Sequence, residues 1–194
     1  TKGESISIIA VGGYGRAEMA PYSDIDLLFL TPYKQTAWGE TVIESILYLL
    51  WDLGLKVGHS VRNVEESLRL AKSDITIRTA LLENRFIYGE PELARDLNTR
   101  LWSEVFKDTA SEFISEKLKE RDIRHKKQGS QRYLLEPNIK EGKGGLRDLQ
   151  TLYWISKYVY KIDTKKDLIR FNLFTTYDLR LFSQAEDFLW TVRC

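Results

Sequence analysis

The stretch GGYGRAEMAPYSDIDLLFL, residues 12–30, decides the fold that we expect for this chain. It joins a glycine-rich turn to an apolar run that begins with two aspartates, Asp24 and Asp26. Side chains two residues apart in a β-strand point to the same face, so the two carboxylates are expected to project together while Ile25 faces the core. Neighbouring carboxylates repel each other unless a cation lies between them, and Mg²⁺ suits their hard oxygens. The pattern therefore predicts a metal site at the start of this strand.

The residues before the pair predict a phosphate site beside the metal. The segment SISIIAVGG, residues 5–13, is apolar and β-branched, which is typical of a buried strand. The turn GGYG after it lets the backbone approach an anion closely, and Arg16 adds a guanidinium suited to phosphate oxygens. Each motif alone is common in ordinary loops, and the glycine spacing matches neither a dinucleotide fingerprint nor a P-loop. In this order, however, they indicate metal-assisted phosphoryl or nucleotidyl transfer.

The rest of the chain predicts an α+β protein in two parts. Up to residue 90, strands and helices alternate: strands at 24–30 and 55–63, and helices from Trp38 to Leu53, from the Asn63 cap to Lys72, and from the Ser73-Asp74 cap toward Ile87. From Glu92 onward only helical patterns follow, at 93–106, 112–127, 146–160 and from Tyr177. We expect an α/β unit over residues 1–90, with a small mixed sheet and flanking helices, and an all-helical unit over residues 91–194.

The composition narrows the class of protein. Lys and Arg number 29 against 28 for Asp and Glu, which argues against a sequence-independent nucleic-acid binder. Cys194 is the single cysteine, so a disulfide framework is excluded and a reducing cytoplasm is expected. No apolar run approaches the roughly 20 residues of a membrane-spanning helix. We expect a cytoplasmic enzyme whose partners include neither nucleic acid nor a membrane.

The stretch from Gly12 to Leu30 resembles the nucleotidyltransferase signature of the DNA polymerase beta superfamily, in which a glycine turn precedes a DxD pair. With GRAEMAPYSD between the two motifs, it is most similar to the bacterial protein-PII uridylyltransferase family. The segments GHSVRN (58–63) and EPNIKEGKGGLRDLQTLYWI (136–155) resemble further parts of the same family. The resemblance implies a fold of the nucleotidyltransferase type, with the helical unit closing over the nucleotide cleft.

The resemblance also implies an activity and roles for particular residues. The family transfers UMP from UTP to a tyrosine of a PII-type nitrogen regulatory protein, releases pyrophosphate and uses Mg²⁺ or Mn²⁺. On that basis Asp24 and Asp26 are expected to bind the metal, and Gly12 and Gly13 to hold the triphosphate. Arg16 is expected to contact phosphate, with a surface arginine that caps a loop as its alternative.

Three further residues near the expected site are left with open roles. Glu83 is a candidate third carboxylate that binds metal or acts as a base, and the alternative is an ion pair with Arg85 or another neighbour. The strand at 55–63 carries no acid, so His59 or Arg62 would approach the phosphates if its side chains share the face of Asp24 and Asp26. A lone histidine is more often structural.

A second glycine-rich loop, NIKEGKGGLRD, lies at residues 138–148. On its own this pattern indicates a solvated loop before a helix, but the resemblance implies that Lys140 and Arg147 face the nucleotide. Asp148 is expected to cap the helix or to pair with Arg147. The basic run RHKKQ, residues 124–128, is expected to form a solvated helix face.

The family's full-length members also carry an HD-type hydrolase that removes UMP and small domains that sense glutamine. His59 and His125 are the only histidines here and no His-Asp dipeptide occurs. We therefore expect a C-terminally truncated fragment that lacks those modules and their activities. Two alternatives to uridylyl transfer stay open: transfer of AMP by a different nucleotidyltransferase, and a non-catalytic module that only binds nucleotide.

Overall fold

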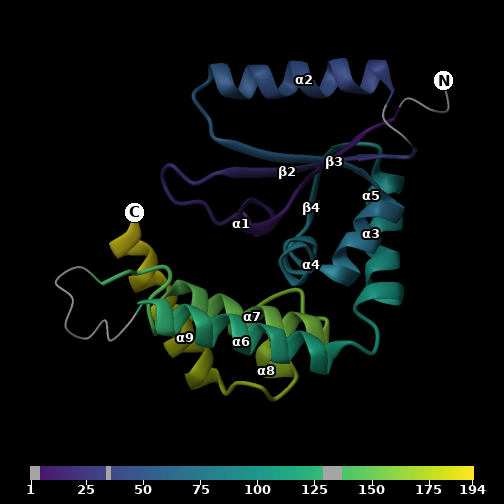
Figure 1. Ribbon diagram of the computed structural model, residues 1–194. Helices are drawn as coiled ribbons and strands as arrows, with labels where there is room; N and C mark the ends of the chain where they lie inside the picture. Colours follow the sequence, from purple (N-terminus) through teal and green to yellow (C-terminus); the bar gives the residue numbers. More distant parts are fainter. Residues whose placement is uncertain (1–4, 34–35, 129–136) are drawn as a thin grey trace. The chain divides into compact units, whose positions relative to one another are not determined.

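The computed structural model describes residues 5–33, 36–128 and 137–194. The chain divides into two compact units, one up to Lys107 and one from Asp108 onward (Figure 1). The boundary falls later than the 90/91 division drawn from the sequence, because α5 (Pro91–Arg100) contacts the sheet of the first unit. Each unit is described by itself.

A four-stranded mixed sheet forms the centre of the first unit. Its strands are β1 (Ser7–Ala10), β2 (Ile25–Thr31), β3 (Val57–Asn63) and β4 (Arg85–Gly89), in the order β3-β2-β1-β4. β1 pairs antiparallel with β2 and β4, whereas β2 pairs parallel with β3. The predicted mixed sheet is therefore confirmed.

The strand β4 corrects one prediction from the sequence. The helix expected to run from the Ser73-Asp74 cap toward Ile87 ends at Leu82, as α4 (Ile75–Leu82), and residues 85–89 form β4 beside β1. The segment RFIYG is rich in aromatic and β-branched residues, which favour strands once a partner strand is present. Its pairing partner lies more than 70 residues earlier in the chain, beyond the reach of local patterns.

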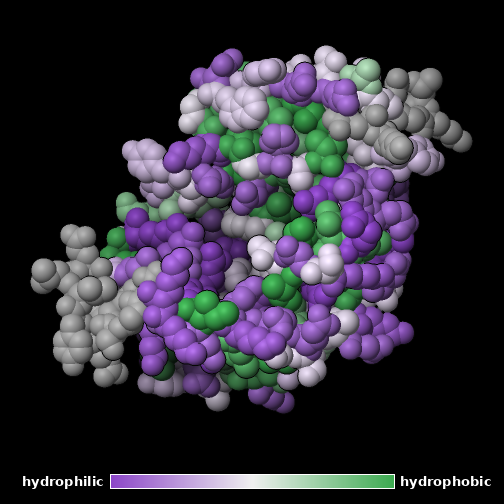
Figure 2. Space-filling model, in the orientation of Figure 1, coloured by the Kyte–Doolittle hydropathy of each residue, from purple (hydrophilic) through white to green (hydrophobic). Residues whose placement is uncertain are grey.

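Helices cover both faces of the sheet. α2 (Ala37–Asp52) lies along one face, where Leu27 and Phe29 of β2 pack against Ile43 and Leu47. Figure 2 shows apolar residues gathered in the layer between α2 and the sheet. The opposite face is covered by α3 (Val64–Ser73), α4 and α5, and a π-helical turn, η1 (Leu101–Val105), continues α5.

The helix ends follow the capping signals in the sequence. The Asn63 side chain accepts a hydrogen bond from the Glu66 N–H at 2.8 Å, which begins α3 as predicted. Asp74 accepts from Thr76 and Ile77 in the same way and begins α4. α2 is followed by Gly54, which takes the left-handed conformation (φ +75°) expected of a helix stop.

The second unit is helical throughout its described residues, as the sequence predicts. It contains α6 (Ala110–Gln128), α7 (Leu146–Tyr160), α8 (Asp167–Arg170) and α9 (Thr176–Arg193). α7 packs against α6 and α9, and the buried ring of Phe113 on α6 stacks on Tyr158 of α7 with centroids 3.9 Å apart. Among the helices described in either unit, none has the length and apolar character needed to cross a membrane.

Candidate functional site

The carboxylate of Asp26 lies in a recess formed by two glycines. Asp26 is the second residue of β2 and stands directly opposite Gly58 of the parallel strand β3. A Cβ at Gly58 would lie 2.7 Å from Asp26 Oδ1, and a Cβ at Gly12 would lie 3.4 Å from Oδ2. Gly12 also has a positive φ of +58°, a backbone conformation that residues other than glycine adopt only with strain. The carboxylate thus occupies space that exists because Gly58 lacks a side chain, while Gly12 borders it at ordinary contact distance and is favoured there by its backbone conformation.

Sequence reasoning missed Gly58, although the sequence carried a signal for it. Glycine weakens a strand interior and often marks a place where another group approaches closely. Gly58 lies within the strand predicted at 55–63, so its presence indicated a close approach. Which group approached could not be known without the register of β3 against β2.

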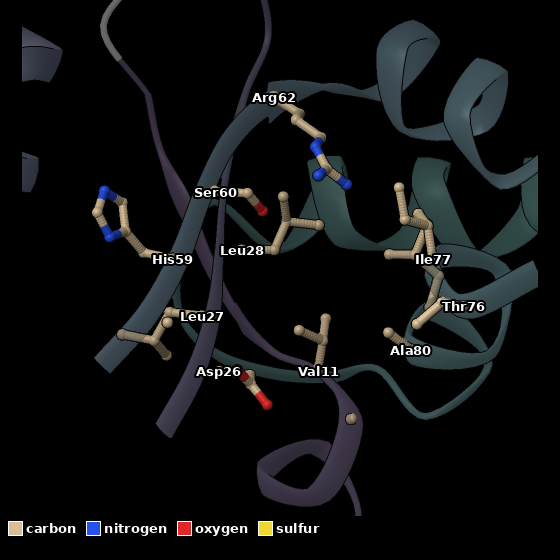
Figure 3. Close-up of a pocket in the computed structure, with 13 residues that line it drawn as sticks. Val11, Asp26, Leu27, Leu28, His59, Ser60, Arg62, Thr76, Ile77 and Ala80 are labelled. Atoms are coloured by element: carbon tan, nitrogen blue, oxygen red, sulfur yellow. The ribbon is translucent and has the colours of Figure 1, made fainter. Parts of the chain in front are cut away.

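A cavity of about 390 Å³ opens beside Asp26 (Figure 3). β2 and β3 form one wall and α4 forms the other. Its lining is mostly apolar, with a few polar side chains: Val11, Gly12, Asp26, Leu27, Leu28, Gly58, His59, Ser60, Arg62, Thr76, Ile77, Ala80 and Leu81. Figure 3 shows the Ser60 and Arg62 side chains turned inward from β3, the Asp26 carboxylate at one end and Arg62 at the other.

His59 points away from this cavity. It alternates with Gly58 and Ser60 along β3, and its ring packs edge-on against Trp51 of α2 with centroids 6.4 Å apart. His59 is among the lining residues, but Figure 3 shows its ring directed away from the cavity. Of the two residues that the sequence proposed as phosphate neighbours, Arg62 shares the face of Asp26 and His59 does not.

Asp24, the other half of the predicted metal pair, lies one residue before β2 and is exposed to solvent. No group of three or more His, Cys, Asp or Glu side chains that could hold a metal ion occurs among the described residues. Mg²⁺ commonly takes one or two protein carboxylates and completes its octahedron with water and substrate phosphates. A half-buried carboxylate in a glycine recess, next to an exposed one, fits that kind of site.

The glycine-rich turn is one turn of helix, α1 (Gly12–Gly15). Its first N–H groups, those of Gly12 and Gly13, have no intrahelical acceptor, and Val11 at the N-cap offers no side-chain cap. The other end of α1 lies against the end of α4, because a Cβ at Gly15 would come within 1.8 Å of the Glu83 carbonyl oxygen. The position of this turn is therefore fixed by backbone contact with α4.

An ion pair between side chains also holds α1 against the end of α4. Arg16 Nη1 donates to Glu83 Oε2 at 3.1 Å, and Arg16 Nε donates to Glu18 Oε2 at 3.0 Å. The Glu83 side chain is completely buried and that of Arg16 is 12% exposed. Two residues further on, Arg85 donates to the carbonyl oxygens of Tyr14 and Gly15. α1 is therefore fastened to the end of α4 and the start of β4.

This arrangement bears on two residues that the sequence singled out. Glu83 forms an ion pair, which was the alternative to a metal-binding role, but its partner is Arg16 and not Arg85. The Glu83 side chain is not part of the cavity lining among the described residues. Arg16, predicted as a phosphate contact, directs its guanidinium at two carboxylates.

The second predicted anion loop belongs to the second unit and folds onto the start of α7. Arg147 N–H donates to the carbonyl oxygen of Lys140 at 2.9 Å. The Arg147 guanidinium donates to Gln150 at 3.0 Å, lies 3.4 Å from Glu141 and stacks over the Trp154 ring. Lys140 Nζ lies 3.9 Å from Glu141. The proposed nucleotide contact of Lys140 and Arg147 stays a prediction.

Asp148 has partners that the sequence did not predict. Its carboxylate accepts hydrogen bonds from the Gly144 N–H at 2.8 Å, from His125 Nε2 at 2.9 Å and from Arg124. Burial alone would raise the pKa of this carboxyl, but the hydrogen bonds from Gly144, His125 and Arg124 outweigh it and lower the pKa below its ordinary value of 3.8. The interpretation of residues 124–128 as a solvated helix face is wrong at Arg124 and His125, which turn toward α7 to make this contact.

Comparisons with known proteins match both units. A nucleotidyltransferase domain family matches residues 1–82, and the GlnD PII-uridylyltransferase family matches residues 112–194. The chain is 63% identical over 193 residues to a bifunctional uridylyltransferase/uridylyl-removing enzyme of Ruegeria pomeroyi. It is 61% identical over 194 residues to the enzyme of that name from Cereibacter sphaeroides and 58% identical over 192 residues to the one from Novosphingobium aromaticivorans. These matches cover 99–100% of the chain but 21% of each relative, so the chain spans about a fifth of their length.

The buried Arg16–Glu83 pair predicts a measurable effect on stability. Glu83→Gln keeps the shape of the side chain but leaves the Arg16 guanidinium without its buried carboxylate, so it should lower the free energy of unfolding by about 1–3 kcal/mol. Urea denaturation checks this. The matched control is Glu92→Gln, which removes an exposed ion pair with Arg95 and should change stability by less than about 1 kcal/mol. Equal effects of the two variants would contradict a supporting role for Glu83.

The lowered pKa of Asp148 predicts a pH-dependent contribution to stability. The contribution is fully present above pH 3.8, the ordinary pKa, and is lost as pH falls through the lower pKa of the folded state. Asp148→Asn should therefore destabilise the chain at pH 7, and its deficit against the wild type should shrink below about pH 4. Urea denaturation across an acid series measures the deficit. A deficit that stays constant from pH 7 to pH 3 would count against ionised Asp148 as its source.

Proposed function

The chain belongs to the family of the bifunctional uridylyltransferase/uridylyl-removing enzymes, and from this premise we propose that it catalyses nucleotidyl transfer from UTP to a tyrosine of a PII-type regulatory protein. The observation that carries the proposal is the Asp26 carboxylate, held in its glycine recess next to the first turn of α1. This arrangement lies within residues 1–82, the part that matches the nucleotidyltransferase domain family. Of the two activities in the relatives' name, we propose only the transfer for this chain.

In this proposal Asp24 and Asp26 hold Mg²⁺ or Mn²⁺. An ion held there would supply charge neutralisation on the triphosphate and would lower the pKa of the attacking hydroxyl. Asp26 supplies a fixed carboxylate, because the recess between Gly12 and Gly58 limits where its oxygens can lie. Asp24, exposed before the strand, supplies a second carboxylate with room for water and phosphate oxygens.

The first turn of α1 orients the triphosphate through the backbone N–H groups of Gly12 and Gly13. Arg16 and Glu83 act behind that turn: their ion pair holds α1 in place, so neither has to contact the nucleotide. The tyrosyl hydroxyl of the protein substrate gives up its proton to solvent water, and its oxygen forms a bond to the α-phosphorus. The bond from that phosphorus to the oxygen bridging the α- and β-phosphates breaks, and pyrophosphate leaves with the electron pair. The nucleophile belongs to the partner, so no tyrosine of this chain takes part.

The experiment that tests this function is calorimetric titration of UTP into the chain with and without Mg²⁺, for the wild type and for Asp24→Asn/Asp26→Asn. We expect Mg²⁺-dependent UTP binding that the double variant loses. Transfer of radiolabelled UMP to a PII protein follows as the activity assay. Preference for ATP over UTP would favour adenylyl transfer, and metal-independent binding unaffected by the double variant would favour a non-catalytic nucleotide-binding module.

The glycine recess generates a sharper prediction. Gly58→Ala places a methyl group 2.7 Å from the present position of Asp26 Oδ1, closer than a Cβ tolerates, so the carboxylate has to turn away. The nucleotide affinity in the presence of Mg²⁺ should fall at least about tenfold, the scale of one hydrogen bond or ligand to a charged group. Stability should change by less than about 1 kcal/mol, because only a flexible side-chain end is displaced.

The matched control for this variant is Gly54→Ala. Gly54 also has no side chain, but its surroundings are open and its φ is positive, so an alanine there should lower stability by about 1 kcal/mol and leave nucleotide binding unchanged. Calorimetry and urea denaturation of both variants should give these opposite patterns. Unchanged binding in Gly58→Ala would remove Asp26 from the proposed metal site.

A further inference from the structure

We propose that Arg62, with Ser60, reads the base of the nucleotide and selects uracil over bases that carry an amino group. This inference rests on the proposed function, since it assigns the far end of the same cavity. Asp26 and Arg62 mark opposite ends of the cavity in Figure 3, with Leu28 between them. Arg62 follows Gly58, the neighbour of Asp26, by four residues, or about 13 Å along β3 at ~3.3 Å per residue.

The walls between the two ends suit a base and not a phosphate chain. Val11 and Leu28 line the sheet side, and Ile77, Ala80 and Leu81 line the α4 side. A triphosphate placed along these side chains would lose its hydration without gaining partners, which is strongly unfavourable for a charged group. A planar ring loses little by the same transfer and gains apolar contact. With the phosphates at the Asp26 end, the base therefore extends toward Arg62.

Arg62 stands out from the other buried or half-buried arginines of the first unit. Arg16 pairs with Glu83 and Glu18, and Arg78 donates to the carbonyl oxygens of Ala71 and Lys72. Arg62 is half-buried and lines the cavity, yet it has no hydrogen-bond or ion-pair partner among the residues that the structure describes. Its five N–H donors are therefore available to an acceptor that binds in the cavity.

The donor pattern of these two side chains favours uracil. A guanidinium only donates hydrogen bonds, whereas a hydroxyl both donates and accepts. Uracil presents the carbonyl acceptor O4 that thymine also presents, while cytosine and adenine carry amino donors at N4 and N6. Arg62 therefore matches the O4 edge of uracil and opposes an amino group in the same position. The hydroxyl of Ser60, on the same face of β3, is available to accept from the uracil N3–H.

The test compares affinities for UTP and CTP with Mg²⁺ present, by calorimetry, for the wild type, Arg62→Ala and Arg69→Ala. Arg69 is the control because it lies exposed on α3 and is not part of the cavity lining. The wild type and Arg69→Ala should prefer UTP. Arg62→Ala should reduce the UTP-to-CTP preference by about 10- to 100-fold, the range for a hydrogen bond to a charged group, while its binding stays Mg²⁺-dependent. Ser60→Ala should reduce the preference less.

Two results would overturn the inference. UTP and CTP affinities that both stay at the wild-type values in Arg62→Ala would show that the guanidinium does not contact the nucleotide. An equal loss of affinity for UTP and CTP, which also leaves their ratio unchanged, would place Arg62 on the phosphates.

A parallel titration of UMP and CMP without metal separates this inference from the proposed function. If UTP binding proves independent of Mg²⁺ but Arg62→Ala still abolishes a preference for UMP over CMP, the base site stands and the transferase proposal fails. If the wild type binds neither UTP nor UMP, or binds UMP and CMP equally, the base site is refuted.

Discussion

The parallel register of β2 against β3 is the constraint on which the rest of the site depends. It sets Asp26 opposite Gly58 and decides, residue by residue, which side chains share a face. Ser60 and Arg62 come to lie with Asp26, whereas His59 and Val61 turn toward α2 and its apolar contacts. A shift of one residue would exchange these two sets, because side chains alternate along a strand. The apolar layer under α2, built on Leu27 and Phe29, holds the register, since slippage would expose it.

The second constraint is the fastening of α1 to the end of α4. A single turn of helix has too few hydrogen bonds to be stable alone. Here it is held by the close contact of Gly15 with Glu83, by the buried Arg16–Glu83 pair and by Arg85 on its last carbonyl oxygens. Because a buried carboxylate and guanidinium are costly to separate, this contact keeps the glycine turn next to Asp26. The residues that hold α1 in position are thus different from those that face the cavity.

The second unit uses charge in a comparable way. Asp148 at the start of α7 accepts hydrogen bonds from the Gly144 N–H, Arg124 and His125. These bonds attach the glycine-rich loop and α6 to the same end of α7. A carboxylate near a helix N-terminus is also favoured by the helix dipole. Lys140 and Arg147, in the same loop and helix, make their described contacts with Glu141, Gln150 and Trp154 inside this unit.

The sequence by itself determined the class of fold and the location of the candidate site. Period-two and period-3.6 patterns, caps such as Asn63 and Asp74, and the order of glycine turn and DxD pair are local, so they could be read without a structure. The tertiary structure alone decided what depends on distant partners. β4 formed where a helix was expected because β1 was there to pair with it. Glu83 pairs with Arg16, which lies 67 residues earlier in the chain, and Gly58 leaves space for Asp26, which lies 32 residues earlier. These contacts join segments that lie far apart in the chain. Local sequence patterns show which residues are present but cannot show which distant residues pair.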